Sequence, residues 1–376
     1  MNQIVHSATT QTSAAAPPPP AYLKALSPLS ADEIRAVTAV IKADPELGPD
    51  ILFENIDLRE PTPSEHRAHL EGQTLPRQAR VNVNHLDRPG VWQLIVSLAD
   101  KSIVSRKHFP TARAGFMVEQ MLSVEVNVKN DPRFVEACRK RGIEDMTGVI
   151  VDSWSGGNFG HKDEEGRLIS HTFSWLRVHE FGNYYAHPIE GLNAVIAVKT
   201  GEVLRVDDYP DHPPIPMTRY DYDPEFLPAP SAPLKTLDVV QPDGVSFTID
   251  GHAIAWDKWT LAIGFTPREG LVLHDIRFDG RSVVRRAAIA ELVVPYGSPL
   301  YGHARQNIFD VGEYGFGKLT NSLKLGCDCL GTIHYLDAEV NGINGEPVTI
   351  ERPCAFTKKM REFSGNTGIS VPVARC

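Results

Sequence analysis

The chain has 376 residues, of which 42% are apolar and 23% charged, and its formal net charge is -9. This length predicts two or three domains, each able to bury a core of its own. The negative charge argues against a general nucleic-acid binder, because phosphate binding needs a basic surface, and no apolar run approaches the roughly 18 residues of a membrane helix.

The N-terminal stretch MNQIVHSATTQTSAAAPPPP is dominated by Ala, Pro, Thr and Ser. It lacks the charged start and apolar core of a secretory signal. Such a composition buries little surface, so we expect residues 1–24 to form a disordered tail. The chain has 5 cysteines, too few at this length for a disulfide framework, and we expect an intracellular location.

Residues 25–118 are expected to form a small α+β domain, one helix against a sheet. In LSADEIRAVTAVIKAD, Ser30 precedes the acids Asp32 and Glu33, which is a favourable helix start, and apolar residues then recur at helical spacing. The stretches DILFENIDLRE, QARVNVNHLD and GVWQLIVSLAD alternate or are apolar between turn residues, and they predict strands.

A similar order of elements returns in residues 119–228. The stretch AGFMVEQMLSVEVNVKNDPRFVEACRKRG predicts helical pieces around Asp131-Pro132, and VIVDSWSGGN, LISHTFSWLRVH and NAVIAVKTGEVLRVDDY predict strands. No sequence identity connects the two units, so they indicate a similar architecture rather than a repeat. Pro-rich, polar residues predict a linker over 229–244.

Residues 245–352 are expected to form an antiparallel β domain. Alternating apolar runs follow one another here, and turns such as Asp279-Gly280 separate them.

Asp310 lies in the stretch NIFDVGEYGFG, between Phe309 and Val311. If it faces inward, loss of water raises the pKa of its carboxyl and makes it a usable proton acceptor near neutral pH. The alternative is a strand-end Asp that bonds to the turn at Gly312. Tyr296 has the same two interpretations: a hydroxyl presented to a ligand, or a core aromatic.

His171, His179 and His187 recur every eight residues, but metal ligation needs convergence and a second set of supporting contacts, so we favour solvated or core histidines. Cys327 and Cys329 could bind zinc together with Cys354, but a fourth ligand is missing and the spacing fits no zinc finger. A single disulfide is the other special use for these cysteines.

Three stretches of the β region carry a resemblance to a known family: WTLAIGFTPREGLVLHDIRFDG, AELVVPYGSPLYGHARQNIFDVGEYGFG and NSLKLGCDCLGTIHYLDAEV. They resemble the start of the catalytic domain of copper-containing primary amine oxidases, close to the fungal and yeast type. HPIEGLNAVIAVKTGEVLRVDDY is similar to the second small N-terminal domain of that family, and residues 25–118 to the first. The resemblance covers residues 25 to 352.

The resemblance implies two small helix-on-antiparallel-sheet (cystatin-like) domains and then the beginning of a large antiparallel β-sandwich. It implies oxidation of primary amines to aldehydes by oxygen, with release of hydrogen peroxide and ammonia, copper and topaquinone as cofactors, and a homodimer. By this resemblance Asp310 matches the proton acceptor and Tyr296 the tyrosine that bonds a quinone oxygen. Cys329 matches one half of a disulfide, with Cys354 as the nearest candidate for the other half.

The sequence departs from the family in its cofactor motifs. The quinone-forming tyrosine lies in an Asn-Tyr-Asp/Glu motif, and copper needs a His-x-His pair and a third His; neither motif occurs in this chain. We therefore expect a chain truncated within the catalytic domain that is inactive as it stands. The alternative is a non-enzymatic remnant or binding module built from the N-terminal domains.

The last residues, 353–376, also depart from the family. Where it continues with Cys-Leu-His-Glu-Glu-Asp and Leu-Trp-Lys-His, this chain reads PCAFTKKMREFSGNTGISVPVARC. One permitted set of codons for these residues, read two bases later, spells VCLHEEDAGILWKHRDFSTGR. We therefore expect an out-of-frame tail that does not pack as a native element.

Overall fold

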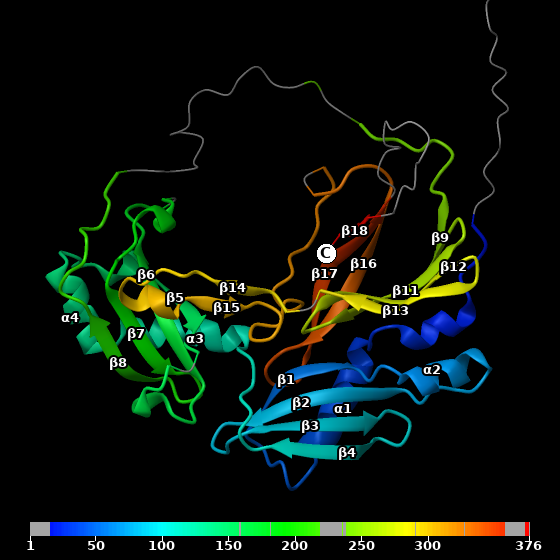
Figure 1. Cartoon of the computed structure of the whole chain (residues 1–376), viewed down its shortest axis with the longest axis horizontal. Coiled ribbons are helices and arrows are strands. Elements are labelled where there is room, and N and C mark those ends of the chain that lie inside the picture. Colours follow the sequence, from blue (N-terminus) through cyan, green and yellow to red (C-terminus); the bar gives the residue numbers. More distant parts are fainter. Residues whose placement is uncertain are drawn as a thin grey trace, which may run out of the picture.

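The computed structural model describes residues 16–157, 159–180, 182–218, 235, 238–289, 291–326, 328–357 and 373–375. Figure 1 shows two small units, each with helices against a sheet, and a third unit made of sheets. The predicted α+β class with mostly antiparallel sheets is confirmed. In the described part of the chain, no helix is both long and apolar enough to cross a membrane.

The first unit is an antiparallel four-stranded sheet in the order β1-β2-β3-β4, with α1 against it. η1 (Ala21–Leu26) precedes this unit in the chain. The elements of the unit are α1 (Ala31–Lys42), β1 (Ile51–Leu58), α2 (Pro63–Leu70), β2 (Gln78–His85), β3 (Val91–Ser97) and β4 (Ser102–Phe109). The predicted helix start is confirmed, because the Ser30 Oγ accepts from the Glu33 amide at 3.3 Å and the Glu33 carboxylate accepts from the Ser30 amide at 2.8 Å.

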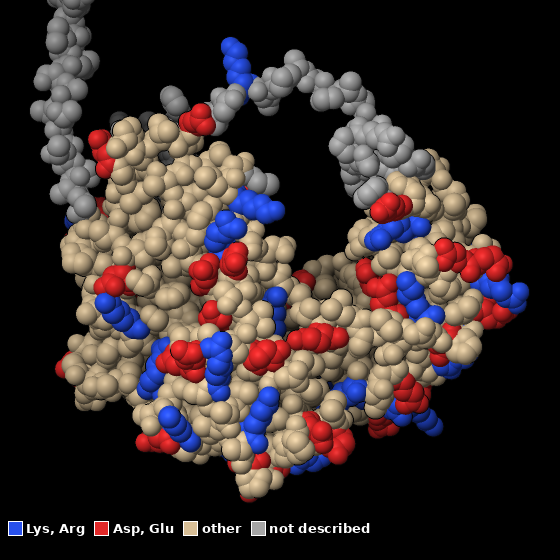
Figure 2. Space-filling view, turned by 180° about the vertical axis from the view of Figure 1, so that it is seen from behind, with Lys and Arg blue, Asp and Glu red and all other residues tan. Residues whose placement is uncertain are grey.

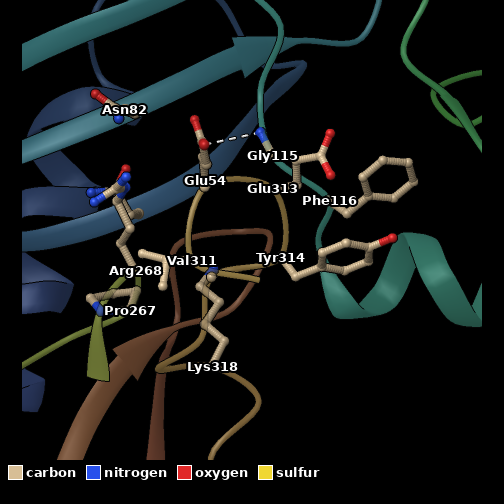
Figure 3. A pocket seen from close by; sticks show the side chains of 13 residues that line it. Glu54, Asn82, Gly115, Phe116, Pro267, Arg268, Val311, Glu313, Tyr314 and Lys318 are labelled. Atoms are coloured by element: carbon tan, nitrogen blue, oxygen red, sulfur yellow. Dashed lines mark hydrogen bonds between the residues drawn. The ribbon is translucent and has the colours of Figure 1, made fainter. Parts of the chain in front are cut away.

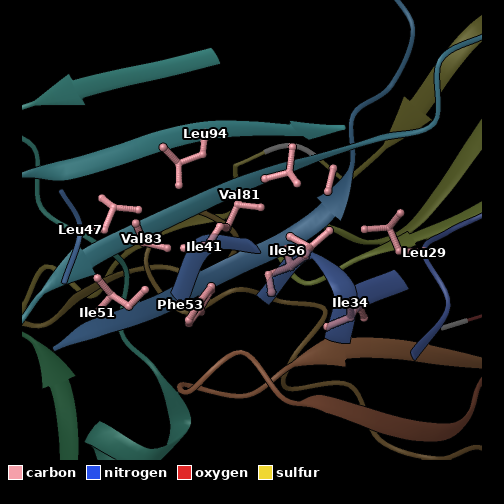
Figure 4. Packing of buried hydrophobic residues seen from close by; sticks show 13 residues of the cluster. Leu29, Ile34, Ile41, Leu47, Ile51, Phe53, Ile56, Val81, Val83 and Leu94 are labelled. Carbon is pink, nitrogen blue, oxygen red and sulfur yellow. The ribbon is translucent and has the colours of Figure 1, made fainter. Parts of the chain in front are cut away.

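The core of the first unit fills the space between α1 and the sheet (Figure 4). Ile34, Val37 and Ile41 of α1 are fully buried, and Phe53 and Val81 meet them from the strands. The helical spacing of these apolar residues is what joins α1 to the sheet, since it places them on one helix face.

The second unit repeats this architecture with the order β5-β6-β7-β8. Its elements are α3 (Val118–Lys129), α4 (Pro132–Lys140), η2 (Met146–Gly148), β5 (Val149–Ser155), η3 (Lys162–Glu164), β6 (Ile169–Leu176), η4 (Tyr184–Ala186), β7 (Leu192–Ala197) and β8 (Glu202–Asp208). The break between α3 and α4 falls at Asp131-Pro132, as predicted, and the Asp131 side chain caps α4.

The third unit holds two antiparallel sheets that share a core. The first sheet contains β9 (Phe247–Asp250), β10 (Ala253–Trp256), β11 (Trp259–Thr266), β12 (Gly270–Phe278) and β13 (Arg281–Ala288); the second contains β16 (Ile333–Asn341), β17 (Pro347–Thr357) and β18 (Val373–Arg375). Phe265 of one sheet and Phe356 of the other belong to the same buried cluster. Asp279 and Gly280 both have positive φ at the β12–β13 turn, as a tight hairpin requires.

The turn between β16 and β17 joins the third unit to the first. The Asn341 side chain accepts from the Ile56 amide at 2.8 Å and donates to the Phe53 carbonyl at 3.1 Å. The Thr38 hydroxyl of α1 donates to the Gly345 carbonyl at 2.6 Å. These bonds fix the β16–β17 turn against both α1 and β1.

Charge is mixed over the face of the molecule that lies behind the view of Figure 1. Figure 2 shows acidic and basic side chains interspersed over one face of the molecule. This face therefore offers no continuous basic surface for a nucleic acid.

Two predictions about the termini were wrong where the structure describes them. Residues 21–24 belong to η1, and Leu23 and Leu26 pack on Ala253 and Ala262, so the predicted disordered tail does not extend to residue 24. Residues 353–357 continue β17, with Ala355 and Phe356 buried, because the apolar run CAF completes the shared core of the two sheets. Residues 373–375 pair with them as β18.

Some predictions fall on other parts of the chain. Residues 1–15, 358–372 and 376 lie outside the described residues, as does half of the predicted linker at 229–244.

Candidate functional site

Tyr296 and Asp310 lie at opposite ends of a two-stranded antiparallel ribbon. β14 (Val293–Pro295) pairs with β15 (Asn307–Phe309), and Pro295 is opposite Asn307. The Tyr296 amide donates to the Gln306 carbonyl at 3.2 Å, and the Asp310 amide donates to the Leu292 carbonyl at 3.1 Å. Four residues of extended chain separate the two ends, which is about 13 Å.

Neither side chain is deeply buried. Tyr296 is 50% exposed and meets Trp154 edge-to-face with ring centroids 5.3 Å apart. Asp310 is half-buried; Val311 is buried, but Phe309 is 37% exposed. The expected apolar frame around Asp310 is therefore present on one side only, because the chain turns at this residue and Phe309 and Val311 no longer share a face.

Arg305 fastens the ribbon to the second unit. It lies at the end of η5 (Tyr301–Arg305), within the loop that joins the two strands, and its guanidinium donates to both carboxylate oxygens of Glu164 at 2.8 and 2.9 Å. It also donates to the Gly156 carbonyl at 2.6 Å. Burial disfavours the Glu164 charge, but the bonds from Arg305 and Arg205 outweigh it and hold the pKa of Glu164 below its usual range.

The turn after Asp310 provides a second attachment. The Tyr314 hydroxyl accepts from the Ser155 amide at 2.6 Å, and the Glu313 carboxylate accepts from the Ser155 hydroxyl at 2.7 Å. The Tyr314 ring stacks on Phe116 with centroids 5.6 Å apart. Burial raises the pKa of Tyr314, and the nearby negative charges of Glu313 and Asp310 raise it further. Asp310 therefore lies in a loop whose later residues, Glu313 and Tyr314, are bonded to Ser155 at the end of β5.

A cavity of about 100 Å³ lies where this loop meets the first unit (Figure 3). Glu54 of β1 and Lys318 of the loop line it, together with Arg268 and Tyr314. Glu54 accepts from the Gly115 amide at 3.0 Å, and burial raises the pKa of its carboxyl. Burial also lowers the pKa of Lys318 to about 8. Asp310 is not among the residues that line this cavity.

The described residues do not fit a copper site. Of the groups of His, Cys, Asp and Glu that the structure describes, His161, Asp163 and Glu164 alone lie close enough together to hold a metal, and Arg205 and Arg305 already occupy Glu164. His171 and His187 are buried, and burial lowers the pKa of His171 to about 3, so both are core histidines. His179 is partly buried and belongs to no metal group of the described residues.

The prediction for Cys329 was wrong. Cys329 is a free, buried thiol, and Cys354 is disulfide-bonded. Because Cys138 is also free, neither of the other two described cysteines is the partner of Cys354. Cys329 lies in a turn that makes a bridge with Leu325, rather than on a strand beside β17. Cys327 lies outside the described residues, and the disulfide removes Cys354 as a zinc thiolate.

Sequence reasoning missed the residues that hold the ribbon: Arg305, Glu313 and Tyr314. Their partners in the second unit lie about 150 residues earlier in the chain, and no local pattern reports such a pairing. A charged residue inside an otherwise apolar and glycine-rich stretch was the one available signal.

Three family models match successive parts of the chain. They are described as AGAO-like N2 domain, over residues 30–106; copper amine oxidase, N3 domain, over 119–225; and copper amine oxidase, enzyme domain, over 248–359. The three matches follow the order of the three units of the structure, and the last one includes the β14–β15 ribbon.

Individual relatives agree with these matches. A primary amine oxidase from Arthrobacter sp. (strain P1) is 36% identical over 331 residues, covering 87% of this chain and 50% of the relative. A peroxisomal primary amine oxidase from Pichia angusta is 33% identical, covering 86% and 48%. The solved structure of a copper-containing benzylamine oxidase from Hansenula polymorpha matches with a TM-score of 0.80 and 28% identity, covering 93% and 57%. The chain thus spans about half the length of the curated relatives it matches.

Proposed function

Because the chain belongs to the copper amine oxidase family, we propose that it forms part of an enzyme that oxidises primary amines to aldehydes, consumes oxygen and releases hydrogen peroxide and ammonia. The observation that carries this proposal is the match over 87% of the chain at 36% identity, which extends through all three units. A chance match to one domain would leave the other two unmatched.

The proposal gives Asp310 and Tyr296 the roles that the resemblance implies. Asp310 takes the proton from the substrate carbon that bears the nitrogen, and its side chain is only partly buried. Tyr296 orients the reacting group through its hydroxyl, which the edge-to-face contact with Trp154 helps to position. The bonds from Arg305 and Tyr314 to the second unit keep the ribbon in place.

Copper and topaquinone are the cofactors that family membership implies. The described residues do not fit a copper site, and the sequence has neither a His-x-His pair nor an Asn-Tyr-Asp/Glu motif. We therefore assign the electron-accepting step to no residue of this chain. The same observation favours a second candidate, in which these 376 residues are a non-enzymatic module.

Substrates, assembly and location follow from the same proposal. A primary amine and oxygen are the substrates, and a homodimer is the assembly that the family resemblance implies. The relatives from Pichia angusta and Nicotiana tabacum are named as peroxisomal, and we propose a peroxisomal or cytoplasmic location for this protein.

Peroxide release tests the proposal. We expect the 376-residue chain with added copper to release no hydrogen peroxide from methylamine or benzylamine above a blank without protein. A chimera in which the Pichia angusta sequence continues this chain after residue 352 should release it. Release by the chain alone would show that its own residues supply the missing chemistry; a folded but inactive chimera would favour the non-enzymatic module.

A further inference from the structure

The side-chain amine of Lys318, which lines the cavity of about 100 Å³ described above, has no role in the proposed function. We propose that Lys318 is a covalent binding site for small aldehydes, which condense with its amine to form a Schiff base. The site lies apart from Asp310, and it does not depend on amine oxidation, although small aldehydes are also what the proposed reaction would release.

The backbone of Lys318 is firmly placed. Its amide is shared between the Pro267 carbonyl at 3.2 Å and the Gly315 carbonyl at 2.9 Å. A side chain on the preceding residue, Gly317, would come within 2.0 Å of the Thr266 carbonyl, so the loop lies directly against the β11–β12 turn. A rigid backbone at the root of the side chain aims Lys318 at the cavity that it lines.

The amine of Lys318 has no partner of its own. No hydrogen bond and no ion pair within 4.0 Å joins its Nζ to another described residue. Three carboxylates act on it from a greater distance: Glu54 from β1, Glu119 from α3 and Glu346 from the β16–β17 turn. Arg268 and Glu313 also line the cavity, so groups of both signs face it.

This environment suits an amine nucleophile. Burial lowers the pKa of Lys318 to about 8, although the three carboxylates oppose the change. At pH 7 about 10% of such amines are unprotonated, against about 0.03% for an ordinary lysine. The cavity has the volume of about three waters, so it suits aldehydes of a few heavy atoms.

The condensation balances without an oxidant or reductant. The lone pair of Nζ attacks the carbonyl carbon, a proton moves from nitrogen to the former carbonyl oxygen, and the carbinolamine then loses water as the C=N bond forms. Loss of water needs an acid, and Glu54 lines the same cavity with a pKa that burial raises. Once protonated, the Schiff base is a cation that Glu54, Glu119 and Glu346 stabilise.

Two other lysines provide internal comparisons. Lys199 is also partly buried, and burial lowers its pKa, but its Nζ donates to the His85 carbonyl at 2.7 Å. Lys258 forms a surface ion pair with Asp279 at 3.4 Å, with 55% of its side chain exposed. If a low pKa alone decided the rate of reaction with an aldehyde, Lys199 would react nearly as fast as Lys318. If exposure alone decided it, Lys258 would react fastest of the three.

The test is competitive labelling of the full chain. The protein is treated at pH 7 with limiting acetaldehyde and cyanoborohydride, which reduces each Schiff base to an ethylated lysine, and peptide mass spectrometry then measures ethylation at each lysine. We expect Lys318 to be ethylated about tenfold faster than Lys199 and Lys258, since its larger free-amine fraction is partly offset by lower intrinsic nucleophilicity. Its rate should level off above about pH 8, while that of Lys258 continues to rise.

Unfolding in urea should remove the preference, because the cavity no longer exists. Lys318→Arg should remove the label from this peptide and leave the labelling of Lys258 unchanged. Equal or slower labelling of Lys318 in the folded wild type would overturn the proposal, and so would a preference that persists in urea. Because the comparison is made within the wild-type chain, it does not depend on the folding of the variant.

Discussion

The position of the β14–β15 ribbon depends strongly on the side chain of Arg305, whose guanidinium bonds Glu164 and Gly156. Its side chain is 9% exposed and that of Glu164 6%, and they meet at 2.8 Å across the boundary between the third and second units. A buried pair of this kind contributes little over an apolar pair, but removing Arg305 leaves the buried Glu164 carboxylate with Arg205 as its remaining charged partner.

We predict that Arg305→Met lowers the free energy of unfolding by about 2–4 kcal/mol, somewhat less than for a fully unpaired buried charge, because Arg205 still bonds Glu164. Arg167→Met is the matched control, because the Arg167–Glu202 pair has the same 2.8 Å distance but side chains 43% and 59% exposed. The control should cost at most about 1 kcal/mol. Urea denaturation measures both, and equal losses in the two variants would contradict the anchoring role of Arg305.

Glu54 makes the stability of the molecule depend on pH. Burial raises the pKa of its carboxyl in the folded chain above the unfolded value, although the Gly115 amide opposes this. The folded state therefore binds this proton more tightly than the unfolded state, and the Glu54 contribution to stability is lost as pH rises through the folded pKa.

We predict that Glu54→Gln unfolds at a higher temperature than the wild type at pH 7, since the neutral amide avoids burying a charge but can still accept from Gly115. The difference should shrink as pH falls toward about 4, where both groups are neutral. Glu71→Gln, at an exposed position, is the control and should change little. A Glu54→Gln variant that is less stable at pH 7 would show that the charge is needed for attraction to Lys318 or Arg268.

The β16–β17 turn shows how an element joins two units through its backbone. Gly345 has φ +81°, and a Cβ there would come within 2.7 Å of Thr38 in α1 and 3.0 Å of Phe53 in β1. Both the conformation and the space therefore require glycine.

We predict that Gly345→Ala destabilises the chain by about 2–4 kcal/mol, the sum of a left-handed backbone and a steric clash. Gly280→Ala is the control: it has φ +74° with no atom within 4 Å, so it should lose about 1–2 kcal/mol for the backbone alone. Thermal or urea unfolding of the two variants measures the difference. Equal losses of stability would mean that the β16–β17 turn does not pack tightly against the first unit at Gly345.

The elements that sequence could predict are those with local causes. The Ser30 cap, the break at Asp131-Pro132 and the Asp279-Gly280 turn each follow from a few adjacent residues, and all three are present. Burial of Asp310 was one of two interpretations that its neighbours in sequence allowed, and it would hold only within a continuous strand. The contact of Tyr314 with Ser155 joins residues 159 positions apart, which no local pattern could report.

The whole molecule is three units in the order of the matched family domains, with the ribbon of the third unit held on the second. This arrangement supports a role for Asp310 that depends on tertiary position rather than on burial, since Asp310 is only half-buried. Because the described residues do not fit a copper site, proton transfer by Asp310 is measured in the chimera with the Pichia angusta sequence.

The direct measurement is kcat/KM for benzylamine and for its α-deuterated form in that chimera and in its Asp310→Asn variant. Asn keeps the size of the side chain but removes its basic oxygen, so kcat/KM should fall by about 10²–10⁴ with a large deuterium isotope effect, while circular dichroism shows an unchanged fold. If the folded Asp310→Asn chimera retains the activity of its parent, Asp310 is a structural residue and the proposed proton transfer is wrong.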